Sequence, residues 1–258
     1  MEQLMIIDTH AHYDDEAFAK DREVVLQKLK QSGIDLVINV GASMETSKNT
    51  VELCERYDFV YGAVGVHPNE TAELTEESIE QIKEYTKLPK IVAVGEIGLD
   101  YYWDEPAREL QKKWFLRQLD LAKEVSLPVI IHSRDAARDT WDLLNCTEYR
   151  QIGGVIHCFS YGVEMARNYL NSGYFLGIGG VVTFKNAKKL KEVVEYAPLD
   201  QLVLETDCPY LAPEPNRGKR NSSLNLPYVI TQIAELKQVS EEEVIRITSE
   251  NAKRLYRL

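Results

Sequence analysis

Eight short apolar runs alternate with amphipathic segments from one end of this chain to the other. The runs are rich in Val and Ile and lie at 4–8, 35–40, 60–66, 91–97, 128–132, 153–158, 174–179 and 202–206. Such runs are typical of buried strands, and parallel strands need helical crossovers. Eight strand–helix units predict a (β/α)8 TIM-like barrel in one α/β domain over residues 1–258. An open doubly wound sheet is the alternative, but no GxGxxG motif follows the first run.

The amphipathic segments between the runs predict the helices of this barrel. Those between strands lie at 21–33, 44–57, 75–87, 107–126, 135–149, 163–172 and 187–196, and extra C-terminal helices follow at 226–237 and 240–257. Gly33 and Gly173 stand just past helix ends, where a glycine cap is favoured. The residues 177–180 (GIGG) end the seventh strand and predict a tight turn. The longest predicted loop is 209–227, and loops after barrel strands often carry function.

Composition and charge limit the classes of function. The net charge of −11 argues against non-specific wrapping of nucleic acid, which needs a basic face. No apolar run approaches the roughly 20 residues of a membrane span. The chain starts in a strand without a basic, apolar leader, so we expect no signal peptide and a cytoplasmic location. The four cysteines show no CxxC spacing and are expected to be buried free thiols. No feature indicates a membrane or an obligate protein partner.

All five histidines of the chain stand at the end of an apolar run. The first run leads to His10 and His12, the third to His67, the fifth to His132 and the sixth to His157. Imidazole is the commonest protein metal ligand. Because the carboxyl ends of barrel strands meet on one face, we expect these side chains to converge there.

Carboxylates stand at two further strand ends. Glu96 ends the fourth run, and Glu205 and Asp207 end the eighth. Charged groups at the end of an apolar strand are unfavourable unless they are paired. His10 and His12 are two residues apart and would point to the same side of a strand. By itself this pair also fits two hydrogen-bonded histidines, whereas the combination with the carboxylates predicts a metal centre on the barrel rim.

The chain resembles the TatD-type metal-dependent hydrolases of the amidohydrolase-like superfamily over nearly its whole length. The motifs that carry the resemblance are Asp8-Thr9-His10-Ala11-His12, Gly65-Val66-His67-Pro68, Gly95-Glu96-Ile97-Gly98-Leu99-Asp100, Ile131-His132-Ser133-Arg134, Ile156-His157-Cys158-Phe159, Glu205-Thr206-Asp207 and Arg217-Gly218-Lys219-Arg220-Asn221. The resemblance implies a TIM-like barrel, a divalent-metal centre and deoxyribonuclease activity of the 3′→5′ exonuclease type.

The resemblance also implies which side chains hold the metal. One ion would be held by His10, His12, Glu96 and Asp207, and a second by Glu96, His132 and His157. Glu96 would bridge the two ions, in the place where many relatives in the superfamily have a carboxylated lysine. Asp207 is the expected catalytic base, and Glu205 is expected to support it or to handle a proton. The two divalent ions could be Zn, Mn, Mg, Ni or Fe, since histidine and carboxylate ligands suit several metals.

Substrate contacts are expected from side chains near these strand ends. His67 and Arg134 are placed to contact a phosphate, and arginine suits bidentate phosphate binding. Tyr102, between Tyr101 and Trp103, offers a stacking surface for a base or packs as a lid. The loop cations are expected to face the substrate or to lie in solvent; they are Arg217, Lys219 and Arg220.

Three hypotheses on function follow from these residues. The favoured one is a metal-dependent hydrolase that cleaves phosphodiester bonds in DNA, at single strands or 3′ ends, with a metal-activated water. The alternative is hydrolysis of C–N or C–O ester bonds, such as a lactone or an aminoacyl ester, at the same centre. A metal-binding scaffold without activity is the third, and the open coordination positions argue against it.

Overall fold

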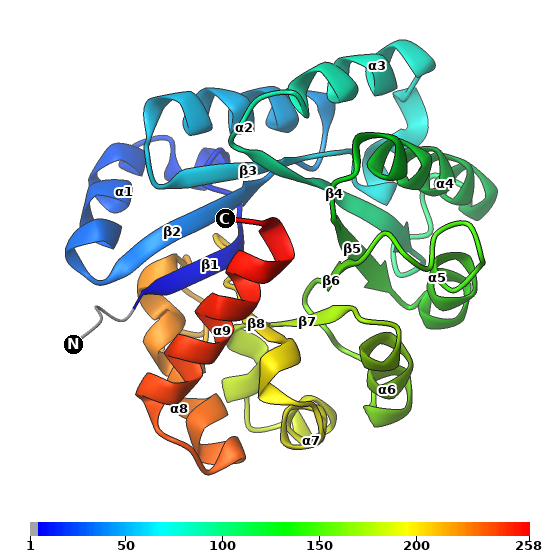
Figure 1. Cartoon of the computed structure of the whole chain (residues 1–258). Coiled ribbons are helices and arrows are strands. Elements are labelled where there is room, and N and C mark those ends of the chain that lie inside the picture. Colours follow the sequence, from blue (N-terminus) through cyan, green and yellow to red (C-terminus); the bar gives the residue numbers. More distant parts are fainter. Residues whose placement is uncertain (1–4) are drawn as a thin grey trace.

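The computed structural model describes residues 5–258, and these form eight parallel strands surrounded by helices (Figure 1). Each strand pairs with the next one along the chain, in the order β1 to β8. The strands are β1 (Ile6–Ala11), β2 (Ile34–Val40), β3 (Val60–Val64), β4 (Ile91–Asp100), β5 (Val129–Arg134), β6 (Gly154–Ile156), β7 (Phe175–Ile178) and β8 (Leu202–Leu204). The predicted TIM-like barrel is therefore confirmed.

The barrel closes between β1 and the chain that follows β8. The amide of Asp207 donates to the carbonyl of His10 at 2.9 Å, and the amide of His12 donates to the carbonyl of Cys208 at 2.8 Å. The hydroxyl of Thr9 also donates to the carbonyl of Leu204 at 2.9 Å. These bonds bring the predicted metal ligands of the first and last strand together.

Helices cover the outside of the barrel in the predicted order. They are α1 (Arg22–Gln31), α2 (Met44–Arg56), α3 (Glu76–Tyr85), α4 (Arg108–Val125), α5 (Ala137–Leu144), α6 (Val163–Asn171), α7 (Lys188–Tyr196), α8 (Leu226–Lys237) and α9 (Glu241–Tyr256). Residues 5–258 also contain five short 3-10 helices: η1 (Glu16–Phe18), η2 (Pro68–Glu73), η3 (Gly180–Thr183), η4 (Leu199–Gln201) and η5 (Ser223–Asn225). Both predicted glycine caps follow helix ends with a positive φ, 79° at Gly33 and 82° at Gly173. Within residues 5–258, none of the helices combines the length and apolar character needed to cross a bilayer.

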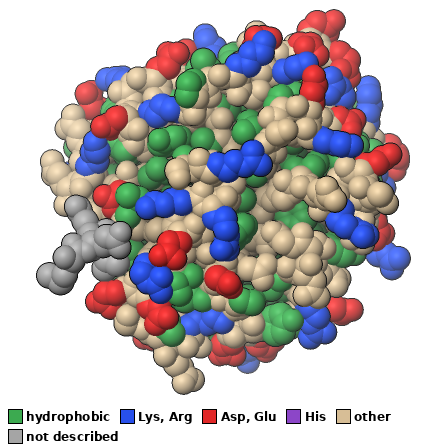
Figure 2. Space-filling model, viewed as in Figure 1, with side chains coloured by type: hydrophobic (Ala, Val, Ile, Leu, Met, Phe, Trp, Pro, Cys, Tyr) green, Lys and Arg blue, Asp and Glu red, His purple; other side chains and the backbone are tan. Residues whose placement is uncertain are grey.

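Apolar side chains fill two regions of the core. A large region lies between the strands and the surrounding helices, and a smaller one fills the inside of the barrel. The inner region includes Ile7, Ile38, Ala93 and Val155, and α9 contributes Leu255 to it. In Figure 1, α9 crosses the near end of the barrel, and the matching surface in Figure 2 shows mixed charges and no histidine. Ser249 of α9 donates a hydrogen bond to the carbonyl of Met5, just before β1, so α9 lies at the amino ends of the strands and the predicted metal ligands lie at the opposite end.

Several strand boundaries differ from the prediction. The first strand, predicted at 4–8, runs over Ile6–Ala11 and so contains His10, while Leu4 lies outside the described residues. The fourth and fifth strands continue past their apolar runs, to Asp100 and Arg134. Conversely, β6 is only three residues long, and the helix predicted at 135–149 ends at Leu144. Four free cysteines are present as predicted, but Cys146 and Cys158 are only partly buried.

Gly98 allows β4 and β5 to approach each other closely beside the site. Its φ is +150°, and a Cβ atom built there would lie 1.9 Å from the carbonyl oxygen of His132. No other residue avoids that clash, since glycine alone lacks a Cβ. The close approach brings His132 of β5 next to the carboxylates of β4.

Asp8 links β1 to the chain that follows β8 through a buried hydrogen-bond network. Its carboxylate accepts hydrogen bonds at 2.6 Å from the hydroxyls of Thr206 and Ser223, and at 3.2 Å from the amide of His10. Burial raises the pKa of Asp8 to about 7, against the opposing effect of these hydrogen bonds. The network holds His10 and the residues after β8 in fixed positions.

Replacing Asp8 by alanine is expected to lower the free energy of unfolding by about 1–3 kcal/mol. The buried hydroxyls of Thr206 and Ser223 would lose their acceptor, and an unsatisfied buried donor is costly. Urea denaturation with a chelator present, followed by circular dichroism, measures the change. The control is Asp142→Ala, whose carboxylate contacts the exposed Arg138 and which should shift stability by less than about 0.5 kcal/mol. Equal stabilities of the two variants would contradict this role of Asp8.

Candidate metal centre

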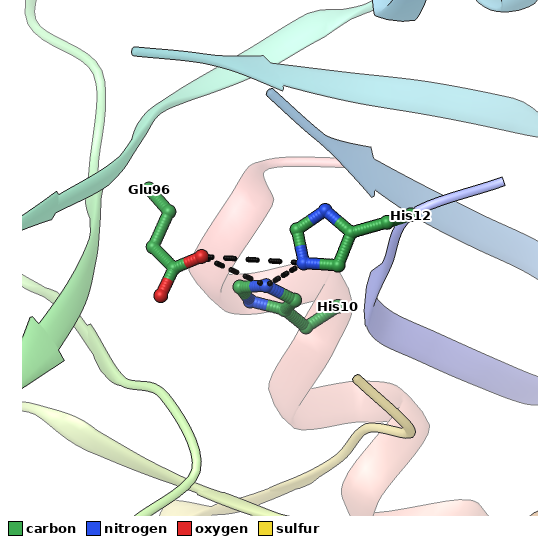
Figure 3. Close-up of side chains that lie close together, drawn as sticks. All are labelled: His10, His12 and Glu96. Atoms are coloured by element: carbon green, nitrogen blue, oxygen red, sulfur yellow. Dashed lines mark hydrogen bonds and ion pairs between the residues drawn. The ribbon is translucent and has the colours of Figure 1, made fainter. Parts of the chain in front are cut away.

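His10 and His12 direct their Nε2 atoms to one point at the end of β1. The two nitrogens lie 3.1 Å apart (Figure 3). The Nδ1 atom of His12 lies 2.8 Å from the carbonyl oxygen of Val40, which can only accept a hydrogen bond. In a neutral imidazole the proton is therefore on Nδ1, and the lone pair of Nε2 faces His10 and the cluster.

Glu96 of β4 lies between two pairs of histidines. Its Oε2 atom is 3.5 Å from Nε2 of His10 and 4.0 Å from Nε2 of His12 (Figure 3). Its Oε1 atom is 2.7 Å from Nδ1 of His132 and 3.8 Å from Nε2 of His157. One oxygen thus faces each pair, and the carboxylate is shared by both.

Asp207 completes the cluster from the chain that follows β8. Its Oδ1 atom lies 3.3 Å from Nε2 of His12, 3.9 Å from Nε2 of His10 and 3.8 Å from Nε2 of His157. The rings of His10 and His157 are stacked with their centroids 3.5 Å apart. The six residues predicted as ligands are therefore brought together by the fold.

Glu205 is buried and lies behind His157 rather than at the centre. Its Oε1 atom is 3.1 Å from Nδ1 of His157 and accepts a 2.6 Å hydrogen bond from the amide of Cys158. A carboxylate at Nδ1 orients the ring so that Nε2 faces the metal side. A Cβ atom on Gly177 would lie 2.1 Å from Oε2 of Glu205, so the glycine of β7 makes room for this carboxylate.

Asp100 and His67 extend the cluster on the side of β4. Nε2 of His132 lies 3.1 Å from Oδ2 of Asp100, while Nε2 of His67 lies 3.9 Å from Oε1 of Glu96. His67 follows β3 and is the N-cap of η2. Asp100 was not among the predicted site residues, although Glu96 and Asp100 are four apart and point to the same side of a strand. That spacing is the signal that could have identified it.

The donor atoms fit a divalent cation. Bonds from zinc to nitrogen or oxygen ligands are about 2.0–2.2 Å long, so neighbouring ligand atoms on one ion are roughly 3–3.5 Å apart. The separations of 3.1 Å between His10 and His12, 3.3 Å between His12 and Asp207, and 3.5 Å between His10 and Glu96 agree with this. Imidazole and carboxylate donors suit several transition metals.

The charges of the cluster compensate each other. Burial would raise the pKa of Glu96, but the imidazoles of His157, His10 and His132 hold it well below its usual range. Burial would lower the pKa of His12, but Asp207 and Glu96 raise it to about 9. In His10, burial and the neighbouring His157 lower the pKa. The carboxylates therefore stay ionised and able to act as ligands.

The centre lies at the bottom of an open cleft of about 810 Å³. Of the predicted substrate contacts, His67 and Arg134 line it, and Trp103 is a further lining residue with 64% of its surface exposed. Tyr102 lies beside it, where the guanidinium of Arg134 stacks 3.8 Å from its ring centroid. Tyr210, which was not among the predicted substrate contacts, adds another exposed aromatic ring to the lining.

The loop cations lie outside this cleft. The guanidinium of Arg217 lies 4.2 Å from the ring centroid of Phe184, and Lys219 is exposed on the same loop. Arg220 forms a 2.6 Å ion pair with Asp21. The contribution of Arg217 and Lys219 to substrate binding stays a prediction, whereas Arg220 has a structural partner.

Acidic side chains line much of the cleft outside the ligand cluster, and these too were absent from the sequence prediction. They are Asp14, Asp15, Glu16, Glu45 and Glu70. Arg134 is the one Lys or Arg side chain that lines the cleft within residues 5–258. Glu45 lies in the first turn of α2, which the sequence pattern predicts at 44–57, whereas the other four come from the segments after β1 and β3, whose course it does not predict.

Comparison with known proteins agrees with the site. A family model described as TatD related DNase matches residues 7–257. An uncharacterized metal-dependent hydrolase, YabD of Bacillus subtilis, is 46% identical to this chain. The alignment covers 98% of this chain and all of YabD. Another, TatD of Mycobacterium tuberculosis, is 36% identical, with 98% of each chain covered. The crystal structure of YjjV, a TatD homologue from Escherichia coli, superposes with a TM-score of 0.92 at 33% identity and covers 98% of both chains.

A parallel barrel with histidines and carboxylates gathered at the carboxyl ends of its strands defines a metal-dependent hydrolase of the TIM-barrel class. Within that class, this chain belongs to the TatD family.

Proposed function

We propose that this protein is a deoxyribonuclease of the 3′→5′ exonuclease type that uses two divalent ions. The ions would be Zn, Mn, Mg, Ni or Fe, and the substrate would be single-stranded DNA or a 3′ end. The observation that carries the proposal is the carboxylate of Glu96, shared between the pair His10 and His12 and the pair His132 and His157. The description of the matching family model, TatD related DNase, supports it.

In the proposed reaction, Asp207 transfers a proton and Glu205 positions a ligand. When bound, divalent ions polarise a phosphodiester and make a water molecule more acidic. The carboxylate of Asp207 would take the proton of the water as its oxygen attacks phosphorus. The bond from phosphorus to the leaving oxygen then breaks, and the same proton passes to that oxygen. Glu205 is a positioning residue that holds the ring of His157.

Side chains around the cleft suit one nucleotide of a DNA end. The guanidinium of Arg134 and the ring of His67 line the cleft beside Glu96, where a phosphate group would lie. Trp103 and Tyr210 expose aromatic surface at its rim. Stacking of a base on such a ring contributes about 1–3 kcal/mol and tolerates any sequence.

Digestion of a labelled oligonucleotide tests this proposal. Purified protein with Mg²⁺, Mn²⁺ or Zn²⁺ should shorten a 5′-labelled single strand stepwise, and a chelator should stop the reaction. Phosphorothioate linkages at the 3′ end should block it, whereas the same linkages at the 5′ end should not. An oligonucleotide that stays intact with every metal would overturn the proposal.

The acidic lining of the cleft favours a second candidate. Asp14, Glu45 and Glu70 would attract an ammonium group and repel a polyanion. The same centre would then hydrolyse a C–O or C–N bond, for example in an aminoacyl ester or a lactone. Parallel assays with such esters and with the oligonucleotide separate the two candidates, because each candidate predicts turnover of only one kind of substrate.

A further inference from the structure

A second cavity, of about 560 Å³, shares a wall with the metal centre on the side of β6 and β7. We call it the α7 cavity; its lining includes Cys158, Gly177, Phe184, Lys188 and Lys189. Cys158 directly follows the predicted ligand His157, and its Sγ lies within 4.8 Å of ligand atoms of His157 and Asp207. Cys158 therefore stands between the metal centre and the α7 cavity.

The rim of the α7 cavity is basic. Lys188 and Lys189 begin α7 and are exposed, and Lys185 precedes them. Among the residues that the structure describes, no carboxylate lies within 4.0 Å of these three ammonium groups. Arg217, held on the ring of Phe184 at 4.2 Å, adds a fourth cation, which lies 4.0 Å from the carboxylate of Glu214. In a chain with a net charge of −11, this basic group is a local exception.

The two sides of the metal centre thus differ in charge. The cleft on the side of β1 to β3 carries acidic residues from the segments that follow these three strands, among them Asp14, Glu45 and Glu70. A string of phosphates on that side would be repelled over about 10 Å, the screening length at 0.1 M salt. On the side of α7 the same phosphates meet lysines. The charge difference therefore gives a bound polyanion one favourable direction.

The interior of the α7 cavity is suited to a base. Phe184 and Phe159 line it together with Val181 and Leu190. Cavities of roughly 300–1,000 Å³ with apolar walls and a few polar groups are typical of small-molecule sites. A flat base beside Phe184 would leave the sugar–phosphate chain at the lysine rim.

We propose that the α7 cavity binds the undigested part of single-stranded DNA next to the scissile phosphate. The base of the adjoining nucleotide stacks on Phe184, and the following phosphates contact Lys188 and Lys189. The acidic side of the cleft then accommodates only the terminal nucleotide that is released. This inference rests on the proposed deoxyribonuclease activity and names the part of the substrate that each side takes.

The lysine pair is tested by charge-matched variants. Lys188→Gln/Lys189→Gln is compared with Lys123→Gln/Lys253→Gln, whose exposed lysines lie at the end of the molecule where α9 crosses the barrel. Binding of fluorescent dT10 is measured by anisotropy over a range of salt concentrations, with a chelator so that no cleavage occurs. The slope of log Kd against log salt should fall by about 1.4 in the first variant, because each lysine that no longer pairs with a phosphate lowers it by about 0.7. Equal slopes in the two variants, or no binding of dT10 to the unaltered protein, would overturn the proposal.

The stacking surface is tested by Phe184→Leu, which keeps much of the volume. Affinity for dT10 should fall by about 5- to 150-fold, the range for removal of one base–aromatic stack. A second oligonucleotide carries one abasic site next to its 3′-terminal nucleotide. The unaltered protein should bind it more weakly than dT10, whereas Phe184→Leu should bind the two oligonucleotides equally well. If both variants weaken binding while no oligonucleotide is cleaved with any metal, the proposed activity fails and the cavity assignment stands. If DNA is cleaved and both variants bind like the control, the cavity assignment fails alone.

Discussion

Replacing Glu96 by glutamine should remove bound metal and abolish hydrolysis together. Glu96 is the carboxylate whose two oxygens face both pairs of histidines, at 3.5 Å from His10 and 2.7 Å from His132. A neutral amide is a much weaker ligand than a carboxylate. Asp207 also lies near His12 and His157, at 3.3 and 3.8 Å, but it is already one of the predicted ligands of the first ion. Loss of a residue that merely supports a ligand weakens metal binding by about 10–100-fold, so we expect a loss above about 100-fold here.

Metal analysis after dialysis, followed by an activity assay, measures both effects of Glu96→Gln. The control is Glu70→Gln, because Glu70 is an exposed carboxylate on the same cleft with no predicted role as a ligand. The control should keep its full metal content. A Glu96→Gln protein that retains both its metal and its turnover would show that the carboxylate does not hold the centre together.

The alternation of apolar and amphipathic segments predicts the architecture because each barrel unit has the same burial pattern. The boundaries are less predictable, since composition reports burial rather than strand pairing. His157 is buried but lies beyond the three paired residues of β6, so the apolar run 153–158 overestimates that strand. Asp100 has the opposite effect, because it is a polar residue that ends the long strand β4 three residues beyond the predicted run 91–97.

The convergence of the predicted ligands could be foreseen for a related reason. Strand ends of a closed barrel converge whatever the loops do, so His10, His132 and Asp207 needed no knowledge of loop conformation. Loop residues did need it. Arg217 and Lys219 were expected to face the substrate or to lie in solvent, and the loop places Arg217 on Phe184, beside the α7 cavity rather than in the main cleft.

Replacing Asp207 by asparagine should leave the fold intact and lower turnover by about 10²–10⁴-fold, the usual contribution of a positioned proton acceptor. Asp207 lies 3.3 Å from His12 and is held in place by the bond from its amide to the carbonyl of His10. Asparagine keeps the size of the side chain and the amide bond but cannot take a proton from water. Circular dichroism verifies the fold, and turnover of the labelled oligonucleotide is measured with saturating metal.

Because Asp207 is also a predicted ligand, turnover of Asp207→Asn must be expressed per bound metal ion. His10, His12 and Glu96 remain to hold an ion, so metal content should fall less than turnover does. Asp135→Asn is the matched control, since Asp135 is exposed and follows Arg134 at the end of β5. If turnover per bound ion equals that of the control, Asp207 acts as a ligand alone. A loss of turnover that persists at full metal occupancy would indicate that Asp207 accepts the proton. Its side chain is 18% exposed, against 6% for Glu96, so of these two carboxylates it is the more accessible to water.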